Sequence, residues 1–186
     1  FDGTKGGYVE TDQTHPVNVY GQTKAEAEQE VLRNPAHTVI RVALTAGSSQ
    51  SGDRSFVEEM RQACRRGHTL TLFVDEFRCA LPAGTVARAV WELLDQERSG
   101  LYHLGGSERM SRWDIGLALA RWYPELSSCL RGGSLKDYTG PPRPPDLSMH
   151  SGKIQKLLSF RLPGFREWLS SPPRPGLDLW DYPPPG

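Results

Sequence analysis

The spacing of apolar residues predicts an amphipathic helix near the start of the chain. Residues 19–32, VYGQTKAEAEQEVL, are mostly strong helix formers. At intervals of four and three residues, one stripe of such a helix carries Tyr20, Lys24, Ala27 and Val31. We expect this stripe to face the packed side of the helix and a second, charged face to be solvated.

Two further segments, 55–66 and 82–96, also have the period of a helix. In the second segment Val86, Val90 and Leu94 recur at every fourth position. This recurrence predicts a helix with one buried face.

A short apolar segment follows each of these helices, at residues 37–44, 69–74 and 100–106, and each segment is a predicted strand. After the third strand, Ser111 and Asp114 have the spacing of a capping box, which predicts the start of another helix. Strands that alternate with helices favour an α/β fold with a largely parallel sheet.

The last third of the chain has a different pattern, with many prolines. Residues 139–146 are expected to be extended, and 151–160 and 163–171 are each expected to contain a short helix. We expect residues 1–170 to form the folded part and the proline-rich residues 171–186 to be an extended, partly disordered tail.

Composition and charge exclude several classes of function. The 186 residues include 22 Lys and Arg and 22 Asp and Glu, and 37% are hydrophobic, which is typical of a soluble globular protein. Nucleic acid and anionic membranes are therefore not expected as partners. With neither a membrane-spanning apolar run nor a signal-peptide pattern, the sequence predicts a cytoplasmic protein.

Metal sites and disulfides are not expected either. The three cysteines, Cys64, Cys79 and Cys129, lack C-x-x-C spacing, and we interpret them as reduced structural thiols. The five histidines are scattered without the spacing of metal ligands.

Tyr20 and Lys24 are the strongest candidates for chemistry. One helical turn places the ammonium group beside the phenol, and a nearby cation favours the phenolate form. Tyr20 could then act as a general acid toward a carbonyl oxygen. The alternative interpretation is an amphipathic helix in which the lysine stem packs and its charged end reaches solvent.

The residues around this pair resemble a known family. FDGT at 1–4, followed by GYVETDQTHPVNVYGQTKAEAE at 7–28, resembles the central stretch of extended short-chain dehydrogenase/reductases, most closely the dTDP-4-dehydrorhamnose reductase (RmlD-like) branch. The segments RVALTAG, GLYHLGG and RPPDLSM fit later parts of that branch more loosely. The resemblance implies the C-terminal part of a Rossmann-like, doubly wound parallel sheet, with a small mixed α/β substrate-binding lobe.

The same resemblance implies an activity and roles for particular residues. The family reduces a keto-sugar nucleotide with NADP or NAD; Tyr20 would be the proton donor, and Lys24 would lower its pKa and hold the nicotinamide ribose. The substrate-pocket candidates that it implies are Arg41, Leu44, Pro82 and Arg143.

Two departures from the family change these expectations. No G-x-x-G-x-x-G dinucleotide motif is present, so we expect a truncated chain that is inactive by itself. The loop after Arg41 lacks the family's Trp and Tyr, and the similar regulatory β-subunit of methionine adenosyltransferase also lacks that Trp. The alternative function is therefore a non-catalytic subunit, and the expected partners include a second copy of the chain or another protein.

Overall fold

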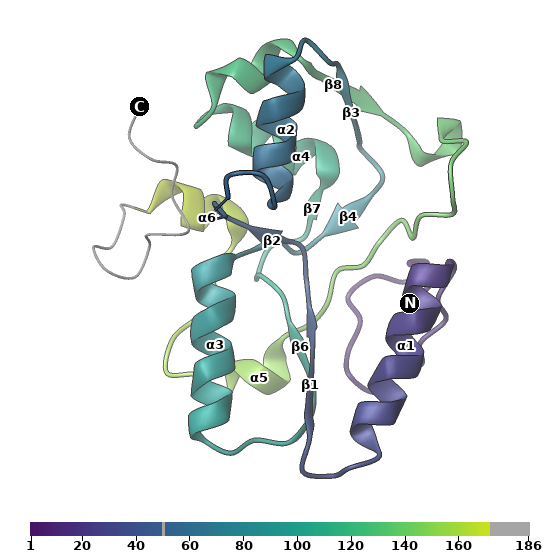
Figure 1. Cartoon of the computed structure of the whole chain (residues 1–186), viewed down its shortest axis with the longest axis vertical. Helices are drawn as coiled ribbons and strands as arrows, with labels where there is room; N and C mark the ends of the chain where they lie inside the picture. Colours follow the sequence, from purple (N-terminus) through teal and green to yellow (C-terminus); the bar gives the residue numbers. More distant parts are fainter. Residues whose placement is uncertain (50, 172–186) are drawn as a thin grey trace.

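The computed structural model describes residues 1–49 and 51–171, in which helices and strands alternate (Figure 1). The proline-rich tail expected at 171–186 lies outside the described residues, except for Ser171. The helices, including two short 3-10 helices η1 and η2, are α1 Val19–Leu32, α2 Phe56–Arg65, α3 Ala83–Asp95, α4 Arg112–Ala120, η1 Pro124–Ser128, η2 Leu135–Asp137, α5 Gly152–Gln155 and α6 Phe165–Ser170. The strands are β1 Thr38–Val42, β2 Thr45–Ala46, β3 Leu70–Phe73, β4 Phe77–Arg78, β5 Leu81–Pro82, β6 Gly100–Leu104, β7 Met110–Ser111 and β8 Leu130–Gly133.

The strands of the described part associate in pairs, and most of the pairs are parallel. β1 pairs with β6, β2 with β5 and β3 with β8, all parallel, while β4 and β7 are antiparallel. Each parallel partner is reached only after intervening helical segments, as parallel pairing requires. The expected α/β class with parallel strands is therefore confirmed.

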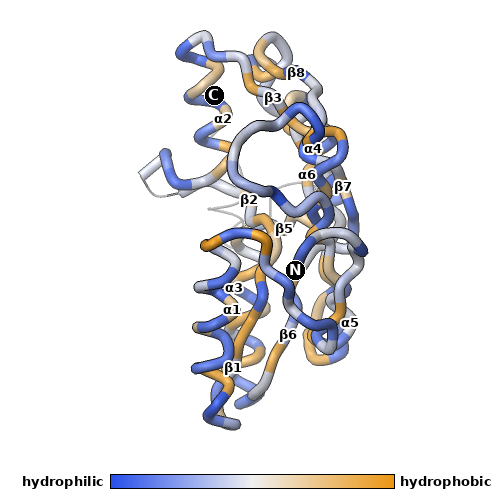
Figure 2. Tube along the Cα trace, turned by 90° about the vertical axis from the view of Figure 1, so that its right-hand side faces the viewer, coloured by the Kyte–Doolittle hydropathy of each residue, from blue (hydrophilic) through white to orange (hydrophobic). Residues whose placement is uncertain are grey.

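One group of elements surrounds the β1–β6 pair. In Figure 1, α1 lies along one side of this pair and α3 along the other. Figure 2 shows hydrophobic residues following β1, β6 and the segment around α5. The core here consists of buried residues from α3, β5, β6 and the segment 154–162: Leu81, Ala89, Leu93, Tyr102, Leu104, Ile154 and Leu162.

A second core lies among α2, α4, η1, β3, β8 and α6, in the upper part of Figure 1. Both α2 and α4 begin with capping boxes, at Ser55 with Glu58 and at Ser111 with Asp114. The second of these was predicted, and it fixes where α4 starts. Phe165 of α6 is fully buried in this core and is packed against Trp168.

One predicted buried face is partly right and another is wrong. Val86 of α3 packs against the core, as predicted. In α3 the buried residues are Ala89 and Leu93, whereas Leu94 is 59% exposed. The buried face therefore follows Val86, Ala89 and Leu93 rather than the strict four-residue repeat that ends at Leu94. In α1 the stripe that carries Tyr20 is exposed rather than packed.

The cysteine prediction is also corrected. Cys64, near the end of α2, and Cys129, just before β8, form a disulfide with their Cα atoms 5.7 Å apart. They are 65 positions apart in sequence, so local spacing carried no signal for this contact. Cys79 is a buried free thiol, and burial raises its pKa. Among the described helices, none combines the length and apolar character needed to cross a bilayer.

Candidate functional site

The start of α1 is fixed by its first residues. Asn18 caps the helix, and its side-chain oxygen accepts a hydrogen bond of 2.9 Å from the Gly21 N–H. A side chain at Gly21 would meet Pro16 at 2.9 Å, so glycine lets the preceding loop pass close to the helix. The helix therefore begins immediately before Tyr20.

Tyr20 and Lys24 lie one turn apart on this helix, as predicted. The Lys24 Nζ atom is 5.6 Å from the centre of the Tyr20 ring. Within residues 1–49 and 51–171, Lys24 forms neither an ion pair nor a hydrogen bond, so its ammonium group is available to a ligand.

The expectation that this stripe faces the packed side is wrong. Tyr20 is 72% exposed, and Lys24, Ala27 and Val31 are exposed as well. The face toward the rest of the described chain is the neighbouring stripe, which consists of partly buried Gly21, Ala25, Glu28 and Leu32. Glycine and alanine permit close approach to β1, and Glu28 finds a cation there.

That cation is Arg41 of β1, one of the predicted pocket residues. Its Nε atom donates to Glu28 at 2.7 Å, a second donor makes an ion pair at 2.5 Å, and both side chains are only 16% exposed. Its Nη1 atom lies 3.0 Å from Nε2 of His103. Arg41 is therefore engaged in holding α1 against the β1–β6 pair.

Two other predicted pocket residues are packed in the interior. Leu44 packs against the second core, and Pro82 is fully buried where β5 leads into α3. Neither residue lines the cavity that contains Arg143.

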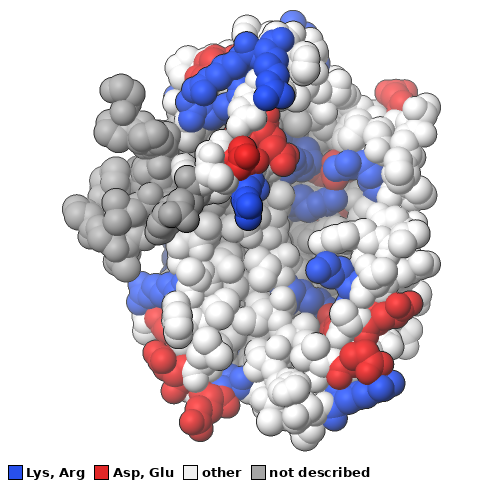
Figure 3. All heavy atoms as spheres, viewed as in Figure 1, with Lys and Arg blue, Asp and Glu red and all other residues white. Residues whose placement is uncertain are grey.

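Arg143, by contrast, lines a cavity of about 600 Å³. The walls come from β3, the β3–β4 loop, β8, η2 and the segment 138–143, together with Arg112 at the start of α4. Two aromatic residues of this wall, Phe73 and Tyr138, meet edge to face at 5.5 Å. Figure 3 shows basic side chains bordering the hollowed middle of the face that it draws.

The cap of α1 contacts the chain segment next to Arg143. The side-chain amide of Asn18 donates to the Pro142 carbonyl at 3.1 Å, next to Arg143. The cap that starts α1 thus also touches the segment that lines the cavity. Of the six predicted site residues, Tyr20 and Lys24 lie on α1, whose cap makes this contact, and Arg143 lines the cavity, whereas Arg41, Leu44 and Pro82 do not line it.

The cavity also contains residues that the sequence did not suggest. Glu76 is 1% exposed and accepts hydrogen bonds from Arg78 at 2.7 Å and Arg143 at 2.9 Å. Burial alone would lower the pKa of Arg143, but its hydrogen bonds to Glu76 raise it. A single acidic residue in a strand-to-strand segment has no spacing signal, so only tertiary structure reveals this cluster.

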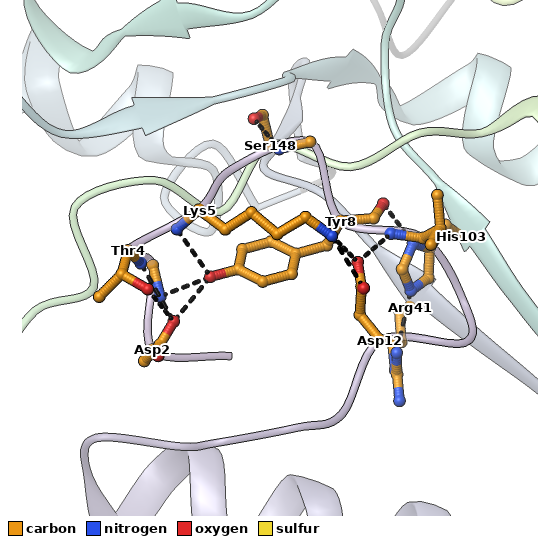
Figure 4. A network of polar contacts seen from close by, with 11 residues as sticks. Asp2, Thr4, Lys5, Tyr8, Asp12, Arg41, His103 and Ser148 are labelled. Carbon is orange, nitrogen blue, oxygen red and sulfur yellow. Dashed lines mark hydrogen bonds and ion pairs between the residues drawn. The ribbon is translucent and has the colours of Figure 1, made fainter.

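The first twelve residues form a second polar network, drawn in Figure 4. The Tyr8 hydroxyl donates to Asp2 at 2.7 Å and accepts from the Gly3 N–H at 3.0 Å. Hydrogen bonds from Thr4 and Tyr8 lower the pKa of Asp2 to about 2. Lys5 pairs with Asp12 at 2.8 Å. These contacts hold the loop in place before α1.

Within the described residues, no group of three or more His, Cys, Asp or Glu side chains is arranged to hold a metal ion. Among the described residues, Tyr20 and Lys24 are suited to contact a nicotinamide cofactor. The exposed Tyr20 hydroxyl and the unpaired Lys24 ammonium are groups that could reach a ribose hydroxyl.

Comparison with known proteins identifies relatives over most of the chain. The sequence model of a family described as the RmlD substrate binding domain matches residues 1–172. A dTDP-4-dehydrorhamnose reductase of Sinorhizobium fredii is 30% identical, over 90% of this chain and 60% of the relative. The methionine adenosyltransferase 2 subunit beta of Xenopus laevis is 31% identical, over 91% of this chain and 54% of the relative. The chain thus spans little more than half the length of these relatives.

Solved structures agree with this assignment. The crystal structure of a hypothetical dTDP-4-dehydrorhamnose reductase from Sulfolobus tokodaii has a TM-score of 0.73 at 27% identity, covering 87% of this chain and 56% of that one. A dTDP-4-dehydrorhamnose reductase from Bacillus anthracis, solved in complex with NADP, has the same fold at a TM-score of 0.75 and 19% identity, covering 91% and 60%. This chain belongs to the RmlD substrate-binding domain family, in the RmlD-like branch of the extended short-chain dehydrogenase/reductases.

Proposed function

We propose that this chain is the proton-donating and substrate-binding part of an NAD(P)-dependent reductase that acts on a keto-sugar nucleotide. One observation carries the proposal: Tyr20 and an unpaired Lys24 stand exposed, one turn apart, on α1, whose capping residue Asn18 contacts Pro142, next to Arg143. The relative from Sinorhizobium fredii, named as a dTDP-4-dehydrorhamnose reductase, supports the substrate class.

Each residue of the pair has a distinct task in this reaction. The Tyr20 hydroxyl donates its proton to the carbonyl oxygen of the sugar as that carbon is reduced. The Lys24 cation stabilises the phenolate that remains and binds a ribose hydroxyl of the cofactor. A bound nicotinamide supplies the hydride. NADP in the Bacillus anthracis structure supports the type of cofactor.

The test is turnover by the full-length gene product. NADPH consumption should be saturable and should require a dTDP-4-keto-sugar. In Lys24→Met, the KM for NADPH should rise and kcat should fall together, because one ammonium group serves both binding and proton transfer. Lys156→Met, at an exposed lysine after α5, is the matched control and should behave like the wild type. Wild-type kinetics in Lys24→Met would refute the assignment.

The second candidate is a non-catalytic regulatory subunit. It is favoured by several relatives of 28–31% identity that are methionine adenosyltransferase 2 subunits beta. A regulatory subunit should bind methionine adenosyltransferase with an affinity that Tyr20→Phe leaves unchanged. A reductase should instead show keto-sugar turnover that depends on Tyr20.

The proposal also covers the folded region, the location and the assembly of the protein. Residues 1–170 would supply the tyrosine and lysine helix together with the substrate-binding lobe. The protein would work in the cytoplasm, as a homodimer or with a partner protein. Sedimentation of the full-length product tests the oligomeric state.

A further inference from the structure

The cavity beside Arg143 contains a buried charge cluster that the Tyr20 and Lys24 chemistry does not use. Its centre is Glu76, whose side chain is 2% exposed. A carboxylate so deeply buried is stable only when cations and hydrogen-bond donors surround it. Here the surrounding cations are arginines, the side chains best suited to binding an anion with two oxygens.

Both oxygens of Glu76 are occupied by these arginines. Oε1 accepts from Arg78 at 2.7 Å and from Arg143 at 2.9 Å, and Oε2 lies 3.2 Å from the same Arg143 nitrogen. Arg78 also donates to the Phe77 and Pro144 carbonyls and is therefore fixed in place. Glu76 thus sits where an external oxyanion would otherwise meet the two guanidinium groups.

Arg143 is the member of the cluster that a ligand can reach. Its side chain is 41% exposed and lies 5.8 Å from the Phe73 ring centre and 5.7 Å from that of Tyr138. It lines the open cavity, whereas Arg78 is not among the lining residues and has only 15% of its side chain exposed. A ligand entering the cavity would therefore meet Arg143 first, already paired with Glu76.

The charges in the cavity wall nearly cancel. Arg112 and Arg143 line it together with Glu76 and Asp137. Removing the charge of Glu76 alone would leave an excess of positive charge in a partly buried site, where Coulomb interactions are stronger than in water. The carboxylate of Glu76, which pairs directly with Arg143, therefore weakens the attraction of the wall for an anion.

We propose that Glu76 is an internal counterion that occupies the arginines of this cavity and thereby weakens its binding of diphosphate groups. If the diphosphate belongs to a sugar nucleotide, the inference rests on the proposed function. The effect of Glu76 on the affinity of the cavity for any anion is independent of that function. Glu76 acts as a specificity-determining residue through Arg78 and Arg143.

The experiment measures binding of inorganic pyrophosphate at low ionic strength by isothermal titration calorimetry. The full-length protein is compared with Glu76→Gln, with Glu76→Gln combined with Arg143→Gln, and with Glu125→Gln. The last is the matched control, because Glu125 also pairs with two arginines, Arg61 and Arg65, and does not line the cavity. No cofactor or sugar is needed, so the result is independent of reductase activity.

Glu76→Gln should bind pyrophosphate at least tenfold more tightly than the wild type. Glu125→Gln should match the wild type, and the double variant should lose the gain. Unchanged or weaker binding by folded Glu76→Gln, or a gain that persists in the double variant, would overturn the proposal.

A second measurement covers the case in which Glu76→Gln does not fold. Pyrophosphate should hardly raise the Tm of the wild type, because Glu76 already occupies the arginines. A large rise in the wild-type Tm that Arg143→Gln abolishes would overturn the proposal, since it would show tight anion binding with Glu76 in place.

Discussion

At the residue scale, His103 connects the N-terminal loop to β1, the strand against which α1 packs. It is fully buried, with Nδ1 3.1 Å from the Tyr8 carbonyl and Nε2 3.0 Å from the Arg41 guanidinium. A guanidinium only donates, so Nε2 must accept and Nδ1 must carry the proton. Burial lowers the pKa of His103, which keeps the ring in this neutral form.

This arrangement predicts a pH dependence of stability. Because the pKa of His103 is lower in the folded state than its ordinary value near 6.5, the unfolded chain binds the proton more tightly. The free energy of unfolding should therefore fall as the pH drops below about 6.5 and stop falling below the folded pKa. Urea unfolding at pH 7.5, 6.5 and 5.5 measures this loss.

His103→Gln should remove most of the pH dependence between 7.5 and 5.5. The carboxylates with lowered pKa values, such as Asp2 and Asp12, titrate below this window and leave it clear. An unchanged slope in His103→Gln would show that another group controls stability in this range.

At the scale of secondary-structure elements, the important feature is how α1 packs against the β1–β6 pair. The sequence pattern predicts closely where α1, α2, α3, β1 and β6 begin and end. This is because helix propensity, capping residues and hydrophobic period all act locally. The buried face of α1 does not follow this pattern. Glu28 lies on the packed side because Arg41 is there to receive it, and Arg41 is brought there by tertiary structure.

Glu28→Gln should therefore destabilise the protein. Loss of a largely buried, charge-assisted contact with Arg41 should cost about 2 kcal/mol of unfolding free energy. Glu30→Gln is the control on the same helix: Glu30 pairs with Arg33, but the two side chains are 61% and 76% exposed, so its loss should cost less than about 0.5 kcal/mol. Equal losses in chemical denaturation would contradict this account of how α1 is held.

The disulfide links α2 to β8 and makes a prediction about thiols. Denatured, non-reduced protein should contain one reactive thiol, that of Cys79, and reduction should raise the number to three. Three thiols before reduction would show that the sequence-based interpretation of Cys64 and Cys129 was correct after all. Thiol titration would also bear on the cytoplasmic location, where disulfides are rare.

At the scale of the whole molecule, the described residues contain two cores, and cavities lie between chain segments distant in sequence. The alternation of strand and helix patterns indicated the fold class, and helical spacing indicated the pairing of Tyr20 with Lys24; the family resemblance agreed with both, because all of these signals are local in sequence. The Glu76 cluster could not be predicted, since its members come from β4, the segment before it and residue 143. Likewise, only the fold shows that Asn18, the cap of α1, contacts Pro142 next to Arg143.

The central claim is that Tyr20 donates the proton during reduction of a keto-sugar, and one measurement tests it most directly. That measurement is kcat for NADPH-dependent reduction of a dTDP-4-keto-sugar by the full-length Tyr20→Phe variant, with circular dichroism as a check of folding. Tyr20 is exposed and packs little, so the fold should be retained. We predict a fall of about 10²- to 10⁴-fold, the range for loss of a general acid. A kcat equal to that of the wild type would contradict the claim.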